Sequence, residues 1–247
     1  MKKNLLLSVF LIVAMGPSCS ATKDPRSHLK DDSLTGISFA PCSPETIVQT
    51  ICSTSPTAIH PTQFAVGYRD VEKKREKLRK IKDRPDQIDE YLKKKILPAV
   101  KGPDSVYYIV DGHHTSRALA EESILVLYMR VIHDYSNMTI DAFLAKLKSE
   151  QLVWLYDENG VGNQDPRSLP AKILALKDDP YRSLAEDAQE EGAFNEEPVY
   201  YQQFIWANYF RKVVDKVLLE SNYKEAINEA VLWSKHPKAS HLPGFKD

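Results

Sequence analysis

The sequence has no excess of charge of either sign, because its 247 residues carry 33 Lys and Arg against 34 Asp and Glu. Bulk charge therefore gives no argument for nucleic-acid binding. The chain also has only three cysteines, and it lacks both an HExxH motif and paired Cys and His at zinc-site spacing, which argues against a zinc centre. No internal repeat or low-complexity tract is present, which excludes a repeat architecture. The length suits one large domain or two small ones.

Long apolar runs are also scarce, and the longest, residues 5–15, is too short to span a bilayer as a helix. Two lysines precede this run and small residues follow it at 16–21, which is the pattern of a secretory signal peptide. We therefore expect residues 1–21 to be a signal peptide, and the mature protein to be periplasmic or secreted without a transmembrane segment. A lipid anchor at Cys19 is the alternative, although the glycine and proline before it fit a lipoprotein signal less well.

Two cysteines, Cys42 and Cys52, remain after removal of a signal peptide, and they form an even pair in an oxidising compartment. A disulfide between them would close a short loop and fasten the N-terminal arm, residues 22–56, which is worth roughly 2–3 kcal/mol. The alternative is two independent thiols. A catalytic cysteine is the least favoured interpretation, because neither residue stands beside a histidine in the sequence.

The pattern of apolar residues predicts an α+β fold. One short helix is predicted in the arm, at 44–51. A small α/β core is predicted over residues 57–136. It begins with an edge segment at 59–64 and two helices at 69–82 and 85–95. A hairpin of 96–101 with 106–110, a third helix at 115–122 and a last strand at 124–133 follow. The C-terminal part, residues 137–247, is predicted to be mainly helical and packed on the core, with helices at 140–152, 170–176, 179–189, 200–219 and 224–234.

The densest run of charge, residues 69–82, contains the helical pairs Asp70/Lys74 and Glu76/Lys80 and only a narrow apolar stripe. A solvated surface helix is the favoured interpretation. The alternative is a basic face that collects phosphates near the central motif of the chain.

That central motif is the stretch 106–119, VYYIVDGHHTSRAL, which joins a β-prone run to a helix through Asp111 and Gly112. A strand that ends at glycine and opens a helix presents free backbone N–H groups and the positive end of the helix dipole, which together form a natural anion site. Imidazole, hydroxyl and guanidinium groups follow directly, so phosphate is the anion that we expect there.

The side chains of this motif have distinct expected roles. Asp111 would orient an imidazole or hold a divalent cation, and His113 or His114 would act as general acid or base, with the other histidine in support. The residues expected to bind phosphate are Gly112, Thr115, Ser116 and Arg117. The alternative is an ordinary Asp-Gly turn with capping hydroxyls, together with an ion pair from Arg117 to Glu121.

Several separated motifs also carry a resemblance to a known family. They are HPTQFAVGYRDV (60–71), IVDGHHTSRAL (109–119), DPYRSLA (179–185), WANYFR (206–211) and HLPG (241–244). With these motifs in this order, residues 59–244 resemble the exported ParB-like nuclease family, which is related to the ParB/sulfiredoxin superfamily. The resemblance implies a ParB/sulfiredoxin-like core, a nuclease activity, and a cleft to which His60, Gln63, Tyr68 and Arg69 contribute.

The branches of this superfamily differ at the central motif. ParB proteins carry Gly-Glu-Arg-Arg-x-Arg-Ala there, of which this chain keeps Gly112 and Arg117 but not the paired arginines, so the resemblance does not extend to a ParB-type nucleotide switch. Sulfiredoxins carry Gly-Cys-His-Arg, and His113 stands in place of their reactive cysteine. Free-serine kinases carry Asp-Gly-His-His-Arg, which matches residues 111–114. The histidine common to these last two branches aligns with His114, which we therefore favour as the functional one.

These observations together predict a phosphate-binding or nucleotide-binding protein that acts on a phosphoester, with nuclease as the activity that the family implies. A nucleotide-dependent phosphotransferase and a non-catalytic nucleotide-binding module are the alternatives. No cofactor follows from the sequence, but a divalent cation such as magnesium would suit a nucleotide substrate. A zinc site is the weaker idea, with the candidate ligands His113, His114, His133 and Asp134.

Overall fold

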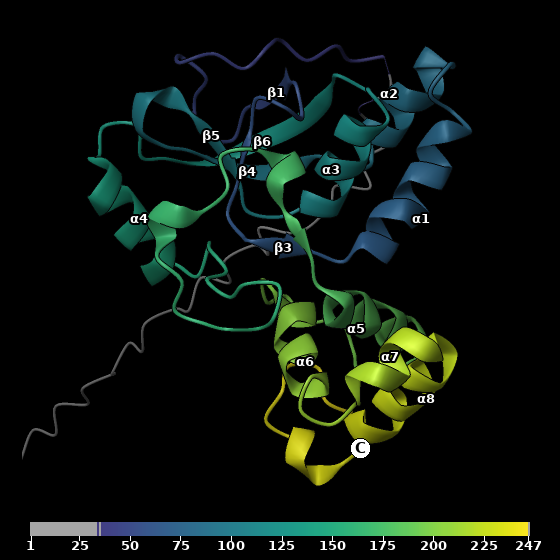
Figure 1. The fold of residues 1–247 in the computed structure, drawn as a ribbon. Coiled ribbons are helices and arrows are strands. Elements are labelled where there is room, and N and C mark those ends of the chain that lie inside the picture. Colours follow the sequence, from purple (N-terminus) through teal and green to yellow (C-terminus); the bar gives the residue numbers. More distant parts are fainter. Residues whose placement is uncertain (1–33, 35, 247) are drawn as a thin grey trace, which may run out of the picture.

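The computed structural model describes residue 34 and residues 36–246, so the predicted signal peptide and Cys19 lie outside the described residues. The described chain has an α+β fold built on a five-stranded mixed sheet (Figure 1). Helices cover the sheet, and a group of C-terminal helices lies at one end of the molecule. None of the described helices is long and apolar enough to cross a membrane.

The sheet has the strand order β1-β6-β4-β5-β2, so its centre comes from the middle of the chain. The bounds in that order are β1 Ile51–Thr54, β6 Leu127–Asp134, β4 Leu97–Lys101, β5 Tyr107–Ile109 and β2 His60–Pro61. The predicted hairpin is confirmed, because β4 and β5 pair antiparallel. The predicted edge segment is confirmed as well, since β2 pairs parallel with β5 at the end of the sheet, where the proline costs no ladder bond.

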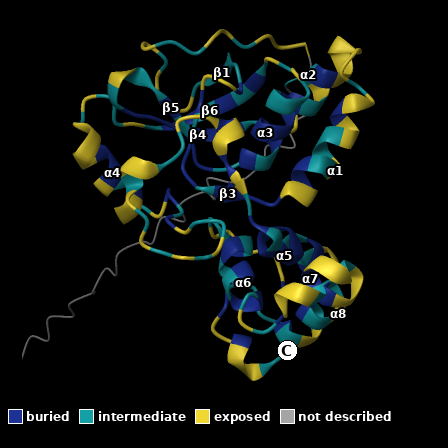
Figure 2. Cartoon of the chain, viewed as in Figure 1, coloured by how far each residue is buried: buried dark blue, intermediate teal, exposed yellow. Residues whose placement is uncertain are grey.

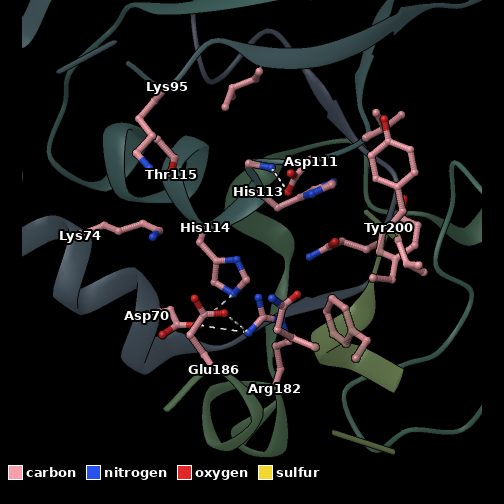
Figure 3. Close-up of a pocket in the computed structure, with 18 of the residues that line it drawn as sticks. Asp70, Lys74, Lys95, Asp111, His113, His114, Thr115, Arg182, Glu186 and Tyr200 are labelled. Carbon is pink, nitrogen blue, oxygen red and sulfur yellow. Dashed lines mark hydrogen bonds and ion pairs between the residues drawn. The ribbon is translucent and has the colours of Figure 1, made fainter. Parts of the chain in front are cut away.

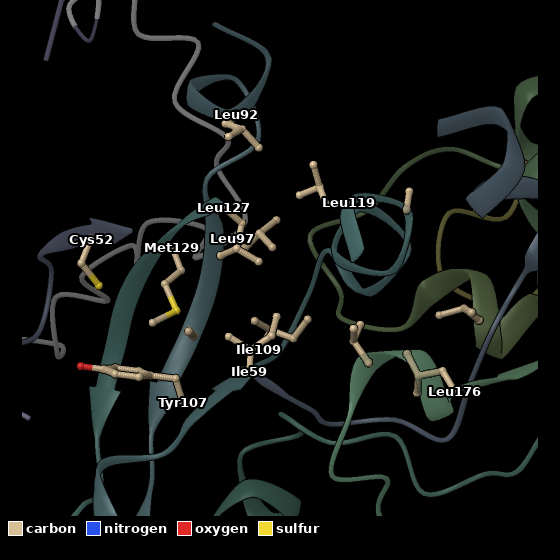
Figure 4. Packing of buried hydrophobic residues seen from close by; sticks show 14 of the residues in the cluster. Cys52, Ile59, Leu92, Leu97, Tyr107, Ile109, Leu119, Leu127, Met129 and Leu176 are labelled. Carbon is tan, nitrogen blue, oxygen red and sulfur yellow. The ribbon is translucent and has the colours of Figure 1, made fainter. Parts of the chain in front are cut away.

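Alternation along the strands sends side chains to two cores. Leu97 and Ala99 of β4 face one core, together with leucines of α1 (Tyr68–Arg79), α2 (Pro85–Lys93) and α3 (His113–Glu121). Figure 4 shows Leu97 in this core with Leu92 of α2 and Leu119 of α3. Val100 lies in the other core, with Phe143 and Leu147 of α4 (Ile140–Ser149). The sheet is therefore buried on both faces, which explains why all five residues of β4 are buried.

The C-terminal helices form a third core around aromatic residues. Figure 2 shows the buried stretches of these helices in dark blue. They are α5 (Pro180–Glu190), α6 (Gln202–Phe210), α7 (Lys216–Ser221) and α8 (Tyr223–Ser234). Trp206 and Phe210 of α6 are fully buried there, so these aromatic side chains pack inside the protein. A short parallel pair, β3 (Ala65–Val66) with β7 (Lys177–Asp178), joins these helices to the α/β part, and α5 packs on α1.

Three predicted helices are wrong. The segment 44–51 forms turns that lead into β1, because Cys42 is bridged to Cys52 and the backbone of Cys42 bonds to Ser53. The segment 200–219 is two helices, since Asp215 caps the first turn of α7. The segment 170–176 contains only a single 3₁₀ turn, Ile173–Ala175. The predicted disulfide is confirmed, whereas the division of the chain at residues 136 and 137 stays a prediction.

Candidate functional site

The central motif folds as a tight reversal between β5 and α3. Gly112 is the N-cap of α3 and has a φ of +81°, a conformation that residues with a side chain rarely adopt. A Cβ on Gly112 would also lie 2.2 Å from Cδ2 of Leu97. The N–H of Gly112 donates to Oδ1 of Asp111 at 2.6 Å, which fixes the turn. Because glycine has no side chain that could cap the helix, the N–H groups in the first turn of α3 can donate hydrogen bonds to a group beyond the helix end.

A cavity of about 430 Å³ lies in front of this helix start, bounded by α1, α5 and the loop that leads into α6 (Figure 3). Six of the residues that the sequence predicts for the site line it, namely Gln63, Asp111, Gly112, His113, His114 and Thr115. The cavity also brings together the cations Lys74, Lys95 and Arg182 and the carboxylates Asp70, Glu186 and Glu196. The rest of its wall is mainly aliphatic and aromatic and includes Tyr200 and Phe204.

His113 ties the helix start to the edge of the sheet. His113 is 2% exposed. Its Nε2 accepts a hydrogen bond at 3.1 Å from the backbone N–H of Thr62, the residue that follows β2. Burial lowers the pKa of His113 to about 3, against the opposing effect of a hydrogen bond with the backbone of Ile109. His113 is therefore neutral near pH 7 and holds structure, which is the supporting role expected for one histidine of the pair.

His114 reaches the cavity and has a different neighbourhood. Its Nε2 accepts the backbone N–H of Gly67 at 2.9 Å and lies 3.8 Å from Oδ2 of Asp70. Burial lowers the pKa of His114 well below its ordinary value, and the positive charges of Arg182 and Lys74 lower it further. A neutral imidazole whose Nε2 accepts a hydrogen bond carries its proton on Nδ1. His114 is therefore a hydrogen-bond donor at neutral pH, and its low pKa makes it a poor general acid.

Opposite His114, one guanidinium lies between two carboxyl groups with different protonation. Nη1 of Arg182 is 3.3 Å from Oδ2 of Asp70 and 2.9 Å from Oε2 of Glu186. Burial raises the pKa of Asp70 to about 7, although the charge of Arg182 opposes the rise. Burial also acts against ionisation of Glu186, but Arg182 outweighs it and keeps the pKa of Glu186 below its ordinary value. Asp70 can therefore exchange a proton near pH 7 while Glu186 stays ionised.

A lysine on α1 completes this group of charges. Lys74 stands one helical turn after Asp70 and lines the same cavity. Burial lowers the pKa of Lys74, and the charges of Asp70 and Glu186 partly restore it. Three other cations of α1 are engaged elsewhere: Lys73 pairs with Asp187 and Glu190, and Arg75 and Arg79 pair with Glu72 and Glu122. Lys74 is thus the cation of residues 69–82 that lines the cavity, and the basic-face hypothesis stays a prediction.

Two predicted phosphate-binding residues do not line the cavity. Arg117 lies one turn into α3, where its Nε pairs with Glu121 at 2.7 Å and its Nη1 donates to the carbonyl oxygens of Leu174 and Leu176. The ion pair given above as the alternative is thus the one present. Ser116 is fully buried, and its Oγ has no hydrogen-bond partner among the described residues.

Of the four residues expected to line the same cleft, only Gln63 does so. His60 packs its ring against Tyr108, with centroids 5.1 Å apart. Tyr68 donates its hydroxyl to the carbonyl oxygen of Leu176 at 3.0 Å. The guanidinium of Arg69 lies 3.6 Å from the centroid of the Tyr223 ring. Tyr68 and Arg69 connect α1 with neighbouring elements, His60 packs on β5, and none of the three lines the cavity.

The charged half of the site is what the sequence reasoning missed. A solvated surface helix is the wrong interpretation for Asp70 and Lys74, which line the cavity from α1. The sequence pattern predicts no place in the site for Arg182 and Glu186, which line it from α5. The available signal was their position, because Asp70 lies in HPTQFAVGYRDV and Arg182 in DPYRSLA, two of the motifs that carry the family resemblance. The aromatic loop before α6 gave no such signal.

The described part of the chain holds no group of three His, Cys, Asp or Glu that could bind a metal ion. The zinc hypothesis is wrong for two of its four candidate ligands, because His133 stacks on Tyr135 and Asp134 pairs with Lys101. Asp111 and Glu196 line the cavity, so carboxylate oxygens, the ligands that magnesium prefers, are present there.

Comparisons with known proteins agree with this architecture. The crystal structure of protein Atu1540 from Agrobacterium tumefaciens is similar, with a TM-score of 0.70 and 29% sequence identity over 79% of this chain and 97% of that chain. No curated protein matches the sequence. The model of the family described as "Putative ParB-like nuclease" matches residues 52–212, which include the sheet, α3 and the Asp70–Arg182 pair. Because this match covers well over half of the chain, the protein belongs to the ParB-like nuclease family.

Proposed function

We propose that the protein hydrolyses phosphodiester bonds of nucleic acids or nucleotides in the cavity at the start of α3. Membership in the ParB-like nuclease family supports a nuclease-like function. The observation that carries the finer proposal is Asp70, a carboxyl group whose pKa is raised to about 7, in the same cavity as the first-turn amides of α3 and the cations Lys74 and Arg182. A base that titrates near neutrality and an anion site are the two parts that such a hydrolysis needs.

The phosphate would lie against the N-terminus of α3. The backbone N–H groups of residues 113–115 offer donors there, and the helix dipole favours negative charge. Lys74 and Arg182 would neutralise the charge that builds on the phosphoryl oxygens, and the Nδ1–H of His114 would donate a further hydrogen bond. The rings of Tyr200 and Phe204 would give the attached base or sugar an apolar wall.

Asp70 would act as the general base. In its ionised form it would accept a proton from water while the water oxygen bonds to phosphorus and the ester P–O bond breaks. The leaving oxygen would then be protonated by solvent or by the proton held on Asp70. Arg182 would remain paired with Glu186, which stays ionised, and so would keep its place during the reaction.

We also propose that the protein acts outside the cytosol. The Cys42–Cys52 disulfide supports this, because such bonds persist in oxidising compartments. Expression of the full chain, followed by N-terminal sequencing of the product from a periplasmic fraction, tests it. A mature end near residue 22 is expected. An uncleaved protein that stays in the cytosol would overturn the proposal, and a lipidated Cys19 would replace the secreted form by an anchored one.

The activity is tested with the chain from residue 22 on single-stranded DNA, RNA and bis(4-nitrophenyl) phosphate, each with magnesium and with EDTA. We expect cleavage whose kcat/KM rises with pH through about 7, and a loss of about 10²- to 10⁴-fold in Asp70→Asn. The matched control is Asp187→Asn, since Asp187 pairs with Lys73 on the same two helices but does not line the cavity.

The outcomes separate the alternatives. Cleavage that Asp70→Asn leaves intact would overturn the assignment of the base. Thermal stabilisation by nucleotides without turnover of any substrate would overturn catalysis in favour of a binding module. Nucleotide turnover that requires an acceptor alcohol would identify a phosphotransferase instead.

A further inference from the structure

We infer that the C-terminal segment 241–245 is a positioning element of the site, because it fastens the loop 195–201 that forms one wall of the cavity. The loop connects α5 to α6 and contributes Glu196, Val199, Tyr200 and Tyr201 to the lining. No helix or strand covers residues 195–201, so the shape of this wall depends on what holds the loop at its ends.

The first set of contacts joins the loop directly to the C-terminal segment. The backbone N–H of Asn195 donates to the carbonyl oxygen of Gly244 at 2.7 Å. The side-chain Nε2 of Gln202 donates to the carbonyl oxygens of Asn195 at 2.7 Å and Pro243 at 3.0 Å. Oε1 of Gln202 accepts the N–H of Glu197 at 3.0 Å. One buried glutamine, 1% exposed, thus joins the start of the loop, its middle and the C-terminal segment.

The second set of contacts comes from the helix that follows. Nε1 of the fully buried Trp206 in α6 donates to the carbonyl oxygen of Pro243 at 2.8 Å. On the cavity side, the hydroxyl of Tyr201 lies 3.1 Å from Oγ1 of Thr62, which connects the end of the loop to the sheet edge. The loop is therefore held between the C-terminal segment on one side and Thr62, the residue that follows β2, on the other.

Gly244 is where this arrangement tolerates no change. Its φ is +74°, and a Cβ there would lie 2.0 Å from the carbonyl oxygen of Asn195, a backbone atom that can move only if the loop moves. Gly192 is the matched comparison, with a φ of +84° but no atom closer than 3.9 Å to its Cβ position. Both substitutions by alanine carry the same backbone strain, and only the one at Gly244 displaces the loop.

The HLPG motif, residues 241–244, thereby has a role in shaping the cavity, although it lies far from the central motif in the sequence. Residues 241–244 lie beyond the span 52–212 that matches the family model, and the cavity lining does not include them. They act through the loop: if the segment shifts, the wall that carries Tyr200 shifts, while Asp70, His114 and Arg182 keep their places on α1, α3 and α5. The expected consequence is weaker substrate binding with the proton-transfer groups intact, a kinetic statement that rests on the proposed function.

Hydrogen–deuterium exchange of the full mature chain tests the inference without reference to activity. In Gly244→Ala we expect exchange of the amides in 196–201 to rise at least tenfold, with α3 unchanged, and in Gly192→Ala we expect no such rise. If Gly244→Ala does not fold, Trp206→Phe removes one fastening bond and should give a smaller rise in the same amides. Protection of 196–201 that is unchanged in a folded Gly244→Ala, or equal effects of the two glycine variants, would overturn the inference.

Kinetics separate positioning from a general loss of stability. With bis(4-nitrophenyl) phosphate, Gly244→Ala should raise KM about tenfold or more, with kcat within about twofold and the same dependence on pH as the parent. A fall in kcat with KM unchanged would overturn the positioning role. If no variant, the parent included, cleaves any substrate, the proposed function fails while the exchange data still decide whether the segment holds the loop.

Discussion

The buried imidazole of His113 makes stability depend on pH in a way that one substitution isolates. Burial holds the pKa of His113 at about 3 in the folded protein, against 6.5 for the unperturbed side chain. Between these values the unfolded chain binds a proton that the folded one does not, so acid favours unfolding. The free energy of unfolding should therefore fall by about 1.4 kcal/mol for each pH unit from about 6 down to 4 on account of this residue alone.

His113→Gln removes the titrating group and keeps an acceptor for the buried N–H of Thr62. At pH 7.5 we expect the variant to be less stable than the parent by about 1–2 kcal/mol, because the amide fills the site less well. As the pH falls below 6.5 the parent alone loses stability through this site. The two proteins should become equally stable near pH 5.5, and at pH 4.5 the variant should be the more stable one.

Urea unfolding at fixed pH values from 4.5 to 7.5, with the disulfide intact, measures the difference between the two proteins. Taking the difference cancels groups that they share, notably Asp70, whose raised pKa acts in the opposite direction over about pH 4 to 7. His241→Gln, at an exposed histidine, is the control and should leave stability unchanged. A difference between parent and His113→Gln that stays constant with pH would refute the reasoning.

Three further predictions concern parts of the chain that hold the site. Gly112→Ala should lower the free energy of unfolding by at least about 2 kcal/mol more than Gly36→Ala, since both have positive φ but only the first meets another side chain; equal losses in thermal unfolding would contradict this. Replacing Cys42 and Cys52 together by serine should cost about 3 kcal/mol, because the bridge closes a loop with a sequence separation of 10; an unchanged urea midpoint would show that the bridge adds nothing. Arg117→Ala should cost about 2 kcal/mol and leave activity intact; lost activity at full stability would restore its predicted role on the phosphate.

Much of the fold could be predicted because its signals are local. The hairpin β4–β5 follows from two β-prone runs around a Gly-Pro-Asp turn, and α4 follows from apolar spacing after Thr139, whose side chain does cap the helix. The break at 211–215 has a local signal too, the cap Asp215, but the aromatic residues before it and the aliphatic residues 217–219 after it together predict one continuous helix. The segment 44–51 was beyond local reasoning, because a disulfide and strand pairing override its helix-start signal.

The residues of the site also fall into those that local sequence predicts and those that only the packing of distant segments brings together. The turn at Asp111 and Gly112 and the two histidines are contiguous in sequence, so the reversal and its cavity could be predicted. Asp70 and Arg182 are 112 residues apart and meet only because α1 and α5 pack on each other. Whether an arginine on a helix points at solvent, at its own helix or into a cavity depends on that packing. Arg117 and Arg182 show both outcomes, since each pairs with an acid four residues later and only Arg182 lines the cavity.

The arrangement of Arg182 between Asp70 and Glu186 has a consequence for the order of two measurable pKa values. A bound phosphate adds negative charge near Asp70 and competes for the guanidinium that favours its ionised form, and both effects raise the pKa of the carboxyl. The profile of kcat/KM reports the free enzyme and should rise through about 7, whereas the profile of kcat reports the complex and should rise at a higher pH. Glu186→Gln removes the neighbouring negative charge, which contributes to the raised pKa, and should move both inflections down. An inflection of kcat below that of kcat/KM would mean that the substrate does not approach Asp70, and the base would then have to be sought among the other carboxylates of the cavity.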